Sequence, residues 1–106
     1  SAGDDDIIAR GPLRIDKEHF TATLDGNPLT LTRSEFNLLR LLARRPGVVF
    51  SRDRIVDAIH GPDYAVTDRS VDVLVVSLRR KMGAHSGLVE TVRGVGYRFR
   101  TDTEQA

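Results

Sequence analysis

Short runs of residues with β character occupy the first third of the chain. They lie at residues 7–9, 13–15, 20–24 and 29–31. The last three alternate apolar and polar residues with the two-residue period of half-exposed strands. Turn residues at 11–12 and 25–28 separate the runs, and the second turn is a strong hairpin signal. These features predict a small antiparallel sheet.

The period changes after residue 31, where Thr32-Arg33-Ser34-Glu35 has the pattern of a capping box. The Thr32 hydroxyl is placed to accept from the Glu35 amide, and the Glu35 carboxylate is able to reach back. A wide apolar face then extends from Phe36 to Ala43, as expected of a buried helix, and residues 44–47 end it.

A second helix follows a short strand predicted at residues 48–50. Ser51 has the residue type and place of its N-cap, and Gly61-Pro62 end it before a loop at residues 63–67. Its inward-facing residues are Ile55, Val56 and Ile59.

A third helix, predicted from about Asp68 to Met82, has two apolar faces. The stripe that faces the core is formed by Val71, Val75, Leu78 and Met82. The opposite side carries Arg69, Val73, Val76, Ser77 and Arg80, with Ser70 and Leu74 at its margin. A solvated face should not carry Val73 and Val76. Either another helix or a dimer partner covers them, or they meet thymine methyl groups and sugar carbons in a DNA major groove while Arg69 and Arg80 reach phosphates or guanine edges.

The last ordered stretch, residues 89–100, predicts a hairpin that turns at Arg93-Gly94-Val95-Gly96. Arg93 lies at its tip, Arg98 and Arg100 follow on the returning strand, and the glycines let the backbone approach a surface closely. The two glycines are no dinucleotide-binding motif, because no helix follows them and the third glycine is missing.

The chain of 106 residues is long enough for one domain, which we expect at residues 7–101 between an acidic linker remnant at 1–6 and a tail at 102–106. With no cysteine, disulfides and thiolate zinc sites are excluded, and a reducing, cytoplasmic home is the natural expectation. The longest aliphatic run has four residues, so no membrane span is expected. We expect no cofactor.

The formal net charge of +1 conceals an asymmetry along the chain. Residues 1–31 carry a net charge of −3, whereas residues 69–100 carry seven basic and two acidic side chains. Basic residues concentrated in this way favour a surface that faces a polyanion, and a solvated basic face is the alternative.

Five sequence blocks in order resemble the OmpR/PhoB-type effector domain, the DNA-binding output domain of two-component response regulators. The blocks are Leu31-Thr32-x-x-Glu35-Phe36-x-Leu38-Leu39, Gly47-x-Val49-x-Ser51-Arg52, Arg69-x-Val71-Asp72-Val73, Leu78-Arg79-x-Lys81 and Thr91-Val92-Arg93-Gly94-x-Gly96-Tyr97-x-Phe99. The resemblance extends from about residue 13 to residue 100. It implies an α+β winged helix-turn-helix with an N-terminal four-stranded antiparallel sheet, three helices and a C-terminal β-hairpin wing.

The resemblance further implies that the helix at 68–82 enters the major groove of double-stranded DNA and that the wing at 91–99 reaches the minor groove. The implied contacts are Arg69, Ser70, Val73, Leu74, Ser77 and Arg79 from the helix and Thr91, Arg93, Gly94 and Tyr97 from the wing. The helical wheel adds Arg80 as a phosphate contact. Asp72 lies off the outward line, so we expect it to orient a neighbouring arginine or to act as a charge at the helix N-terminus. We expect Glu35 and Arg52 to form a structural pair.

The chain departs from the family pattern in the third predicted helix and near the end of the second. Leu74 and Val76 stand where polar residues are common, which leaves fewer hydrogen-bonding readers and predicts more reliance on methyl contacts, phosphate clamping and DNA shape. His60 replaces a tryptophan that is common near the end of the second helix.

The resemblance also implies partners beyond DNA. It implies a receiver domain in the parent protein, a head-to-tail homodimer on directly repeated half-sites, and contact with RNA polymerase through the loop from His60 to Thr67. The present residues contain no receiver domain, so the chain is either an excised fragment or regulated elsewhere.

An enzyme is disfavoured, because the three histidines have no metal-ligand spacing and neither a glycine-flanked serine nucleophile nor a phosphate loop is present. The remaining rival is a winged-helix module whose basic helix binds an acidic protein.

Overall fold

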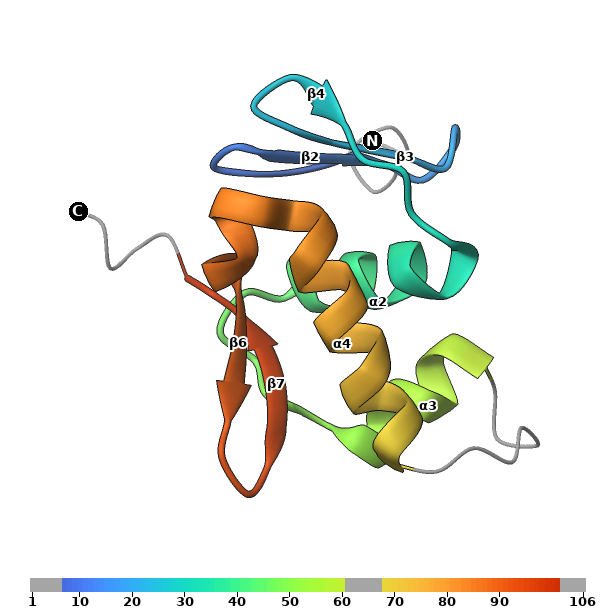
Figure 1. Ribbon diagram of the computed structural model, residues 1–106, viewed down its shortest axis with the longest axis vertical. Coiled ribbons are helices and arrows are strands. Elements are labelled where there is room, and N and C mark those ends of the chain that lie inside the picture. Colours follow the sequence, from blue (N-terminus) through green and yellow to red (C-terminus); the bar gives the residue numbers. More distant parts are fainter. Residues whose placement is uncertain (1–6, 61–67, 102–106) are drawn as a thin grey trace.

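The chain folds as two small sheets around three helices. The computed structural model describes residues 7–60 and 68–101 (Figure 1). In chain order the elements are β1 (Ile7–Arg10), β2 (Leu13–Asp16), β3 (Thr21–Leu24), β4 (Asn27–Pro28), α2 (Arg33–Arg44), β5 (Phe50–Ser51), α3 (Arg52–His60), α4 (Asp68–Met82), the 3₁₀ segment η1 (Gly83–Leu88), β6 (Val89–Val92) and β7 (Gly96–Phe99). This is the predicted α+β architecture.

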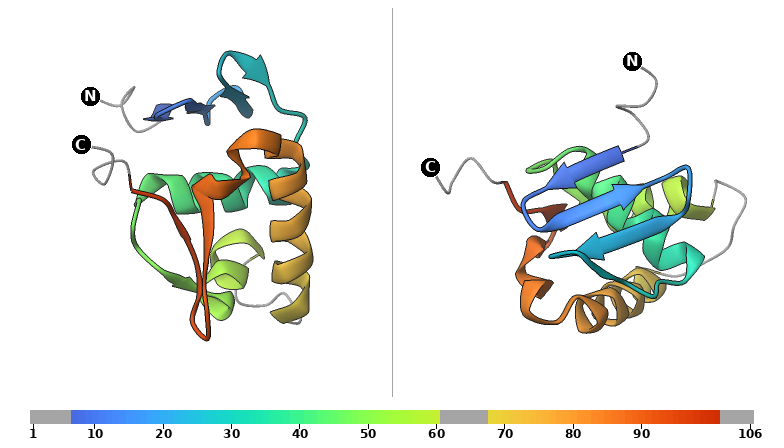
Figure 2. Two further views of the ribbon diagram at one scale, coloured as in Figure 1. Left: turned by 60° about the vertical axis from the view of Figure 1, so that its left-hand side comes forward. Right: turned by 90° about the horizontal axis from the view of Figure 1, so that it is seen from above.

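The N-terminal sheet has the order β1-β2-β3-β4 and is antiparallel throughout. It forms a layer on one side of α2, and the C-terminal hairpin points away from it (Figure 2). One face of the sheet packs inward through Ile8, Leu13, Ile15, Ala22 and Leu24. The small antiparallel sheet predicted from the alternation of apolar and polar residues is therefore confirmed.

The position predicted for the fourth strand, residues 29–31, is wrong. Asp25 and Gly26 both have positive φ, at 52° and 82°, so they complete a two-residue hairpin turn and pairing resumes at once in β4. The N–H of Leu29 still donates to the carbonyl of Ala22 at 2.8 Å, after which the chain leaves the sheet for α2. The third strand likewise begins at Thr21, because Phe20 has a φ of 53° and belongs to the preceding turn.

Helix α2 begins and ends where the sequence predicts. The capping box is present, with the Thr32 N–H donating to Glu35 Oε1 at 2.8 Å and the Glu35 N–H donating to Thr32 Oγ1 at 3.2 Å. At the other end, Arg10 of β1 donates from Nε to the carbonyl of Ala43 at 2.9 Å and from Nη2 to that of Arg44 at 3.4 Å. Both ends of the helix thus have partners for backbone groups that no helical turn can satisfy.

The second sheet has the order β5-β7-β6 and contains the C-terminal hairpin. Its short strand β5 lies at Phe50–Ser51 rather than at residues 48–50, and Ser51 also caps α3 by accepting from the Arg54 N–H at 3.2 Å. Gly96 is opposite Ser51, and a Cβ there would lie 2.0 Å from the carbonyl oxygen of Phe50. A glycine is therefore required where β7 pairs with β5.

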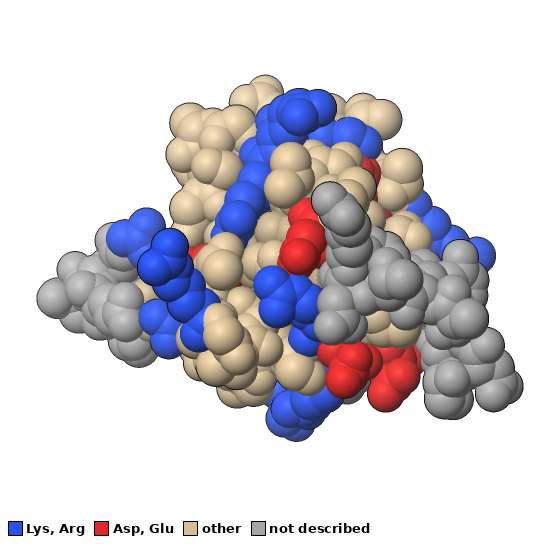
Figure 3. All heavy atoms as spheres, turned by 60° about the horizontal axis from the view of Figure 1, so that its bottom comes forward, with Lys and Arg blue, Asp and Glu red and all other residues tan. Residues whose placement is uncertain are grey.

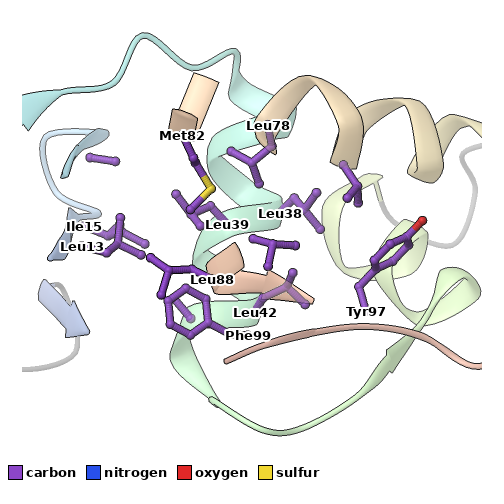
Figure 4. Close-up of a cluster of buried hydrophobic side chains, with 14 of the residues drawn as sticks. Leu13, Ile15, Leu38, Leu39, Leu42, Leu78, Met82, Leu88, Tyr97 and Phe99 are labelled. Carbon is purple, nitrogen blue, oxygen red and sulfur yellow. The ribbon is translucent and has the colours of Figure 1, made fainter. Parts of the chain in front are cut away.

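A single hydrophobic core joins both sheets and the helices (Figure 4). Its largest fully buried side chains are Phe99, Leu13, Ile15, Leu38, Leu39, Leu42, Ile55, Leu78, Val75 and Val89. Helix α4 contributes the predicted stripe of Val71, Val75, Leu78 and Met82, all buried. No helix in the described ranges is both long and apolar enough to cross a membrane.

Candidate nucleic-acid interface

The outward face of α4 is apolar at its centre and is not covered by the rest of the described chain. Val73 is 63% exposed and Val76 is 54% exposed, and Arg80 is exposed one turn further on. Together with Asp72 and Ser77 they line a surface hollow of about 330 Å³. Of the alternatives for these valines, burial against another described helix of the same chain is therefore excluded.

The first flank of α4 is tied to both α3 and the hairpin through Asp72. Arg52 Nε donates to Asp72 Oδ1 at 2.8 Å, and the Tyr97 hydroxyl donates to the same oxygen at 2.5 Å. The Arg52 and Arg79 guanidinium groups lie 5.6 and 5.8 Å from the centre of the Tyr97 ring. Burial and the bond to Asp72 raise the pKa of Tyr97, so its hydroxyl stays a donor.

This arrangement confirms one expectation and overturns another. Asp72 does orient a neighbouring arginine, and that arginine is Arg52. The predicted pair of Glu35 with Arg52 is wrong, because Glu35 bonds to α4 instead. The bond of Asp72 with Arg52 raises the pKa of the guanidinium, which stays charged.

Arg79 connects α4 to the first strand of the hairpin. Its Nε and Nη2 donate to the carbonyl of Val89 at 3.0 and 2.7 Å, and Nη2 also donates to Thr91 Oγ1 at 2.8 Å. These bonds hold the guanidinium against β6. In the structure Arg79 therefore sets the position of the wing relative to the helix.

The second flank of α4 is tied to the start of α2 through Glu35, which is only 3% exposed. Lys81 Nζ donates to Glu35 Oε1 at 2.6 Å, and the Ser77 hydroxyl donates to Oε2. Burial alone would raise the pKa of this carboxyl group, but the bonds from Lys81, Ser77 and the Thr32 amide outweigh it and hold the pKa at about 2. Glu35 is therefore a carboxylate at neutral pH.

The tip of the hairpin is exposed and carries Arg93, Gly94 and Val95 between β6 and β7. Gly94 has a φ of 77°, and a Cβ there would meet nothing within 4 Å, so this turn is open on its outer side. Arg98 is bonded to Glu90 across the strands at 2.8 Å, which offsets part of the charge of the predicted basic finger.

Figure 3 looks toward the end of the molecule that carries the hairpin tip. Lys and Arg side chains are spread over this face with uncharged surface between them, and acidic side chains gather at one edge and at one central point. The face thus carries basic groups among uncharged surface, with acidic side chains near its centre and at one edge, and its basic groups suit contact with a polyanion.

The structure divides the residues predicted to contact DNA into two groups. Exposed positions are Val73, Arg80, Thr91, Arg93 and Gly94. Leu74 packs against the core, Tyr97 is buried, and Ser77 and Arg79 are half-buried and bonded within the chain. Arg69 and Ser70 lie in the first turn of α4, but their side chains are outside the described part of the structure. Residues 61–67 of the loop predicted to contact RNA polymerase are also outside it.

Two further apolar side chains are exposed on α4 and at the hairpin tip and are not among the contacts that the family resemblance implies. Val76 is one of them, and the helical wheel alone marks it as an outward residue beside Val73. Val95 is 51% exposed at the hairpin tip, where alternation gives no sign of which way a turn residue points.

One group of described residues has the spacing of potential metal ligands. Ligand atoms of Asp16, Glu18 and His19 all lie within 4.8 Å of one another on the N-terminal sheet. His19 Nδ1 is 2.7 Å from Asp16 Oδ2, and this pairing lowers the pKa of Asp16 and raises that of His19. The local pairing accounts for the cluster without an ion.

Known proteins match this chain in sequence and in fold. The family described as "Transcriptional regulatory protein, C terminal" matches residues 26–99. The transcriptional regulatory protein BaeR of Escherichia coli O6:H1 is 40% identical over 97 residues, covering 89% of this chain and 40% of BaeR. VxrB of Vibrio cholerae is 42% identical over 101 residues, covering 94% of this chain and 40% of VxrB. The chain thus spans less than half the length of these curated relatives.

Solved structures agree with the sequence matches. The DNA-binding domain of Klebsiella pneumoniae RstA, crystallised in complex with the RstA box, has a TM-score of 0.79 and 33% identity, covering 89% of this chain and 96% of that domain. This chain has a four-stranded antiparallel sheet, three helices and a C-terminal hairpin, and the solved structures that it matches are winged-helix DNA-binding domains. The chain belongs to the OmpR/PhoB-type family of winged-helix DNA-binding domains, the C-terminal parts of transcriptional regulators of two-component systems, which are not enzymes.

Proposed function

We propose that this domain binds double-stranded DNA in a sequence-specific manner, with α4 in the major groove and the hairpin β6–β7 in the neighbouring minor groove. The observation that carries the proposal is the uncovered face of α4, where Val73 and Val76 stand beside Arg80. Thymine methyl groups and sugar carbons would cover the valines, and Arg80 would reach a phosphate.

The wing would add a second point of contact. Arg93 is exposed at the hairpin tip, and none of the ion pairs among the described residues involves it, so its guanidinium is available to enter a narrow groove. The open turn at Gly94 lets the backbone come close to the sugar-phosphate chain. Arg79, Ser77 and Tyr97 would support this geometry from within the domain.

The parent protein would be a response regulator that controls transcription in the cytoplasm. We propose that a receiver domain accompanies this domain, as the greater length of its relatives suggests. Two protomers would bind head to tail on repeated half-sites. Contact with RNA polymerase would involve the loop from His60 to Thr67, of which residues 61–67 lie outside the described part of the chain.

Binding to duplexes at several salt concentrations tests the proposal. A duplex selected from a random pool and a scrambled duplex of equal length are compared by fluorescence anisotropy. We expect the affinity for both to fall steeply with salt, with the selected duplex retaining an advantage of roughly a thousandfold or more. Equal weak binding to both duplexes and to an acidic protein would instead favour an interaction module.

A further inference from the structure

We propose that Glu35 is a positioning residue that fixes the rotation of α4 about its own axis and thereby decides which side chains of that helix meet DNA. The inference rests on the proposed function only for the effect of Glu35 on base preference. The placement of α4 by Glu35 can be measured without DNA.

Glu35 is the one buried charged side chain among the described residues, and all of its bonds lie at one junction. One oxygen accepts from the Thr32 amide of the capping box and from Lys81, and the other accepts from Ser77. The same carboxylate therefore closes the N-terminus of α2 and holds α4. A residue needed only for the cap would not require the two partners on the other helix.

The two partners on α4 are four residues apart and so lie on one side of the helix. Asp72 and Arg79 bond on the other flank of that helix, and its contacts with the core between the two flanks are apolar, through Val71, Val75, Leu78 and Met82. Apolar contacts are not directional, whereas hydrogen bonds lose strength steeply with distance and angle. Glu35 thus supplies directional contacts that apolar packing lacks on this side.

Small rotations of α4 would matter for reading a groove. A helix with its side chains has a radius of about 5–6 Å, so a rotation of about 20° moves the outer atoms by about 2 Å. A displacement of that size takes a donor out of hydrogen-bond range of its acceptor. Ser77 links the two effects, because it bonds to Glu35 and also lines the hollow with Val73 and Val76.

The burial of Glu35 makes the inference testable, because a side chain only 3% exposed cannot touch DNA. A change in base preference caused by Glu35→Gln must therefore pass through α4 or through the start of α2, the two elements to which Glu35 bonds. The matched control is Thr32→Ala, which removes the other half of the same capping box but leaves the bonds to Ser77 and Lys81 in place. Ser77→Ala is a milder second variant that leaves the cap intact.

The first experiment records backbone amide resonances of the free 106-residue protein by NMR. We expect Glu35→Gln to shift the amides of residues 73–80, whereas Thr32→Ala shifts only those near the start of α2. Ser77→Ala alters its own neighbours in any case, so for this variant the expected sign of the bond is a shift of the Glu35 amide. Thermal unfolding confirms that each variant is folded at the temperature used. Resonances of residues 73–80 that stay unchanged in Glu35→Gln would overturn the inference.

The second experiment measures the ratio of affinities for the selected and scrambled duplexes. We expect Glu35→Gln to lower this ratio by about three- to thirtyfold, with little change in affinity for the scrambled duplex, and Thr32→Ala to leave the ratio unchanged. An unchanged ratio in folded Glu35→Gln overturns the role in reading. A wild-type protein that does not distinguish the duplexes refutes the proposed function instead, and the amide resonances still decide whether Glu35 positions α4.

Discussion

The outward face of α4 and its two flanks differ in how their side chains are used. On the face, Val73, Val76 and Arg80 are exposed. On the flanks, the polar side chains are all engaged with neighbouring elements: Asp72 with Arg52 and Tyr97, Ser77 and Lys81 with Glu35, and Arg79 with β6.

The difference separates exposed side chains, which are available to a ligand, from side chains whose bonds within the domain hold α4 in place. A polar residue beside a binding surface is not by itself a contact, because a bond within the domain can account for its position, as for Arg79 and Ser77. Two exposed valines that line the same hollow are more informative, since a patch of exposed apolar surface, unlike a single apolar side chain, is typical of a binding site. The apolar centre of the face is therefore the better indicator of where a ligand lies, and the polar flanks indicate how the face is kept in place.

The largest expected effect comes from Gly96→Ala, which disturbs the bond between Tyr97 and Asp72 on the first flank of α4. The new Cβ would lie 2.0 Å from the carbonyl oxygen of Phe50, so β7 would have to move and carry Tyr97 away from Asp72. We expect a loss of about 3 kcal/mol or more in the free energy of unfolding, measured with urea. Gly94→Ala is the control, since its site is open and only the positive φ costs about 1 kcal/mol. Equal effects of the two substitutions would refute this account of Gly96.

Val73→Asp tests the outward face directly. An acidic group placed among phosphates would weaken binding to the selected duplex by about thirtyfold or more, while the free energy of unfolding changes little because the site is exposed. Fluorescence anisotropy measures the affinity. Ile7→Asp, on the N-terminal sheet away from the hairpin tip (Figure 1), should leave the affinity unchanged. Unaltered binding by Val73→Asp would remove α4 from the interface.

Acid should weaken the flank that contains Glu35. The pKa of its carboxyl group is about 2 in the folded protein, against an ordinary value of 4.5, so the unfolded chain binds the proton more readily. The stabilisation is complete above the ordinary pKa and is lost as the pH falls toward the folded one. From about pH 5 to about pH 3 we expect the wild type to lose about 2 kcal/mol more stability than Glu35→Gln. Parallel pH profiles of the two proteins would contradict the assignment.

Tyr97→Phe is expected to have the smallest effect. It removes the hydroxyl that donates to Asp72 but keeps the ring against Arg52 and Arg79, so the free energy of unfolding should fall by about 1 kcal/mol. Urea unfolding of Tyr97→Phe in the wild-type and the Asp72→Ala backgrounds isolates the bond, because alanine offers the hydroxyl no acceptor. If the loss is the same in both backgrounds, the hydroxyl contributes through another partner.

The sequence predicts the elements whose signals are local. The capping box at Thr32, the stripe from Val71 to Met82 and the turn at Gly94 depend on residues a few positions apart, and the structure has all three. The predicted position of the fourth strand is wrong because residues 25–28 all have the composition of a turn, although residues 27–28 form the strand. Only the positive φ angles of Asp25 and Gly26 show that the turn has two residues and not four.

Partners far apart in the chain could not be predicted in the same way. A helical wheel gives the direction of Ser77 but not the carboxylate 42 positions earlier that it meets. The mistaken pair of Glu35 with Arg52 has the same origin, since charge alone does not distinguish Arg52 from Lys81. Such choices depend on how α2, α3 and α4 pack, which the pattern of apolar residues leaves open.

The bonds from Arg10 to the end of α2 bear on where this domain can be cut. The family match begins at residue 26, yet Arg10 satisfies the carbonyls of Ala43 and Arg44, and the strands before residue 26 bury Leu13 and Ile15 completely. A fragment that starts at residue 26 would leave the carbonyls of Ala43 and Arg44 without these donors and would expose apolar core side chains to water. Expression of a usable fragment should therefore start no later than Ile7.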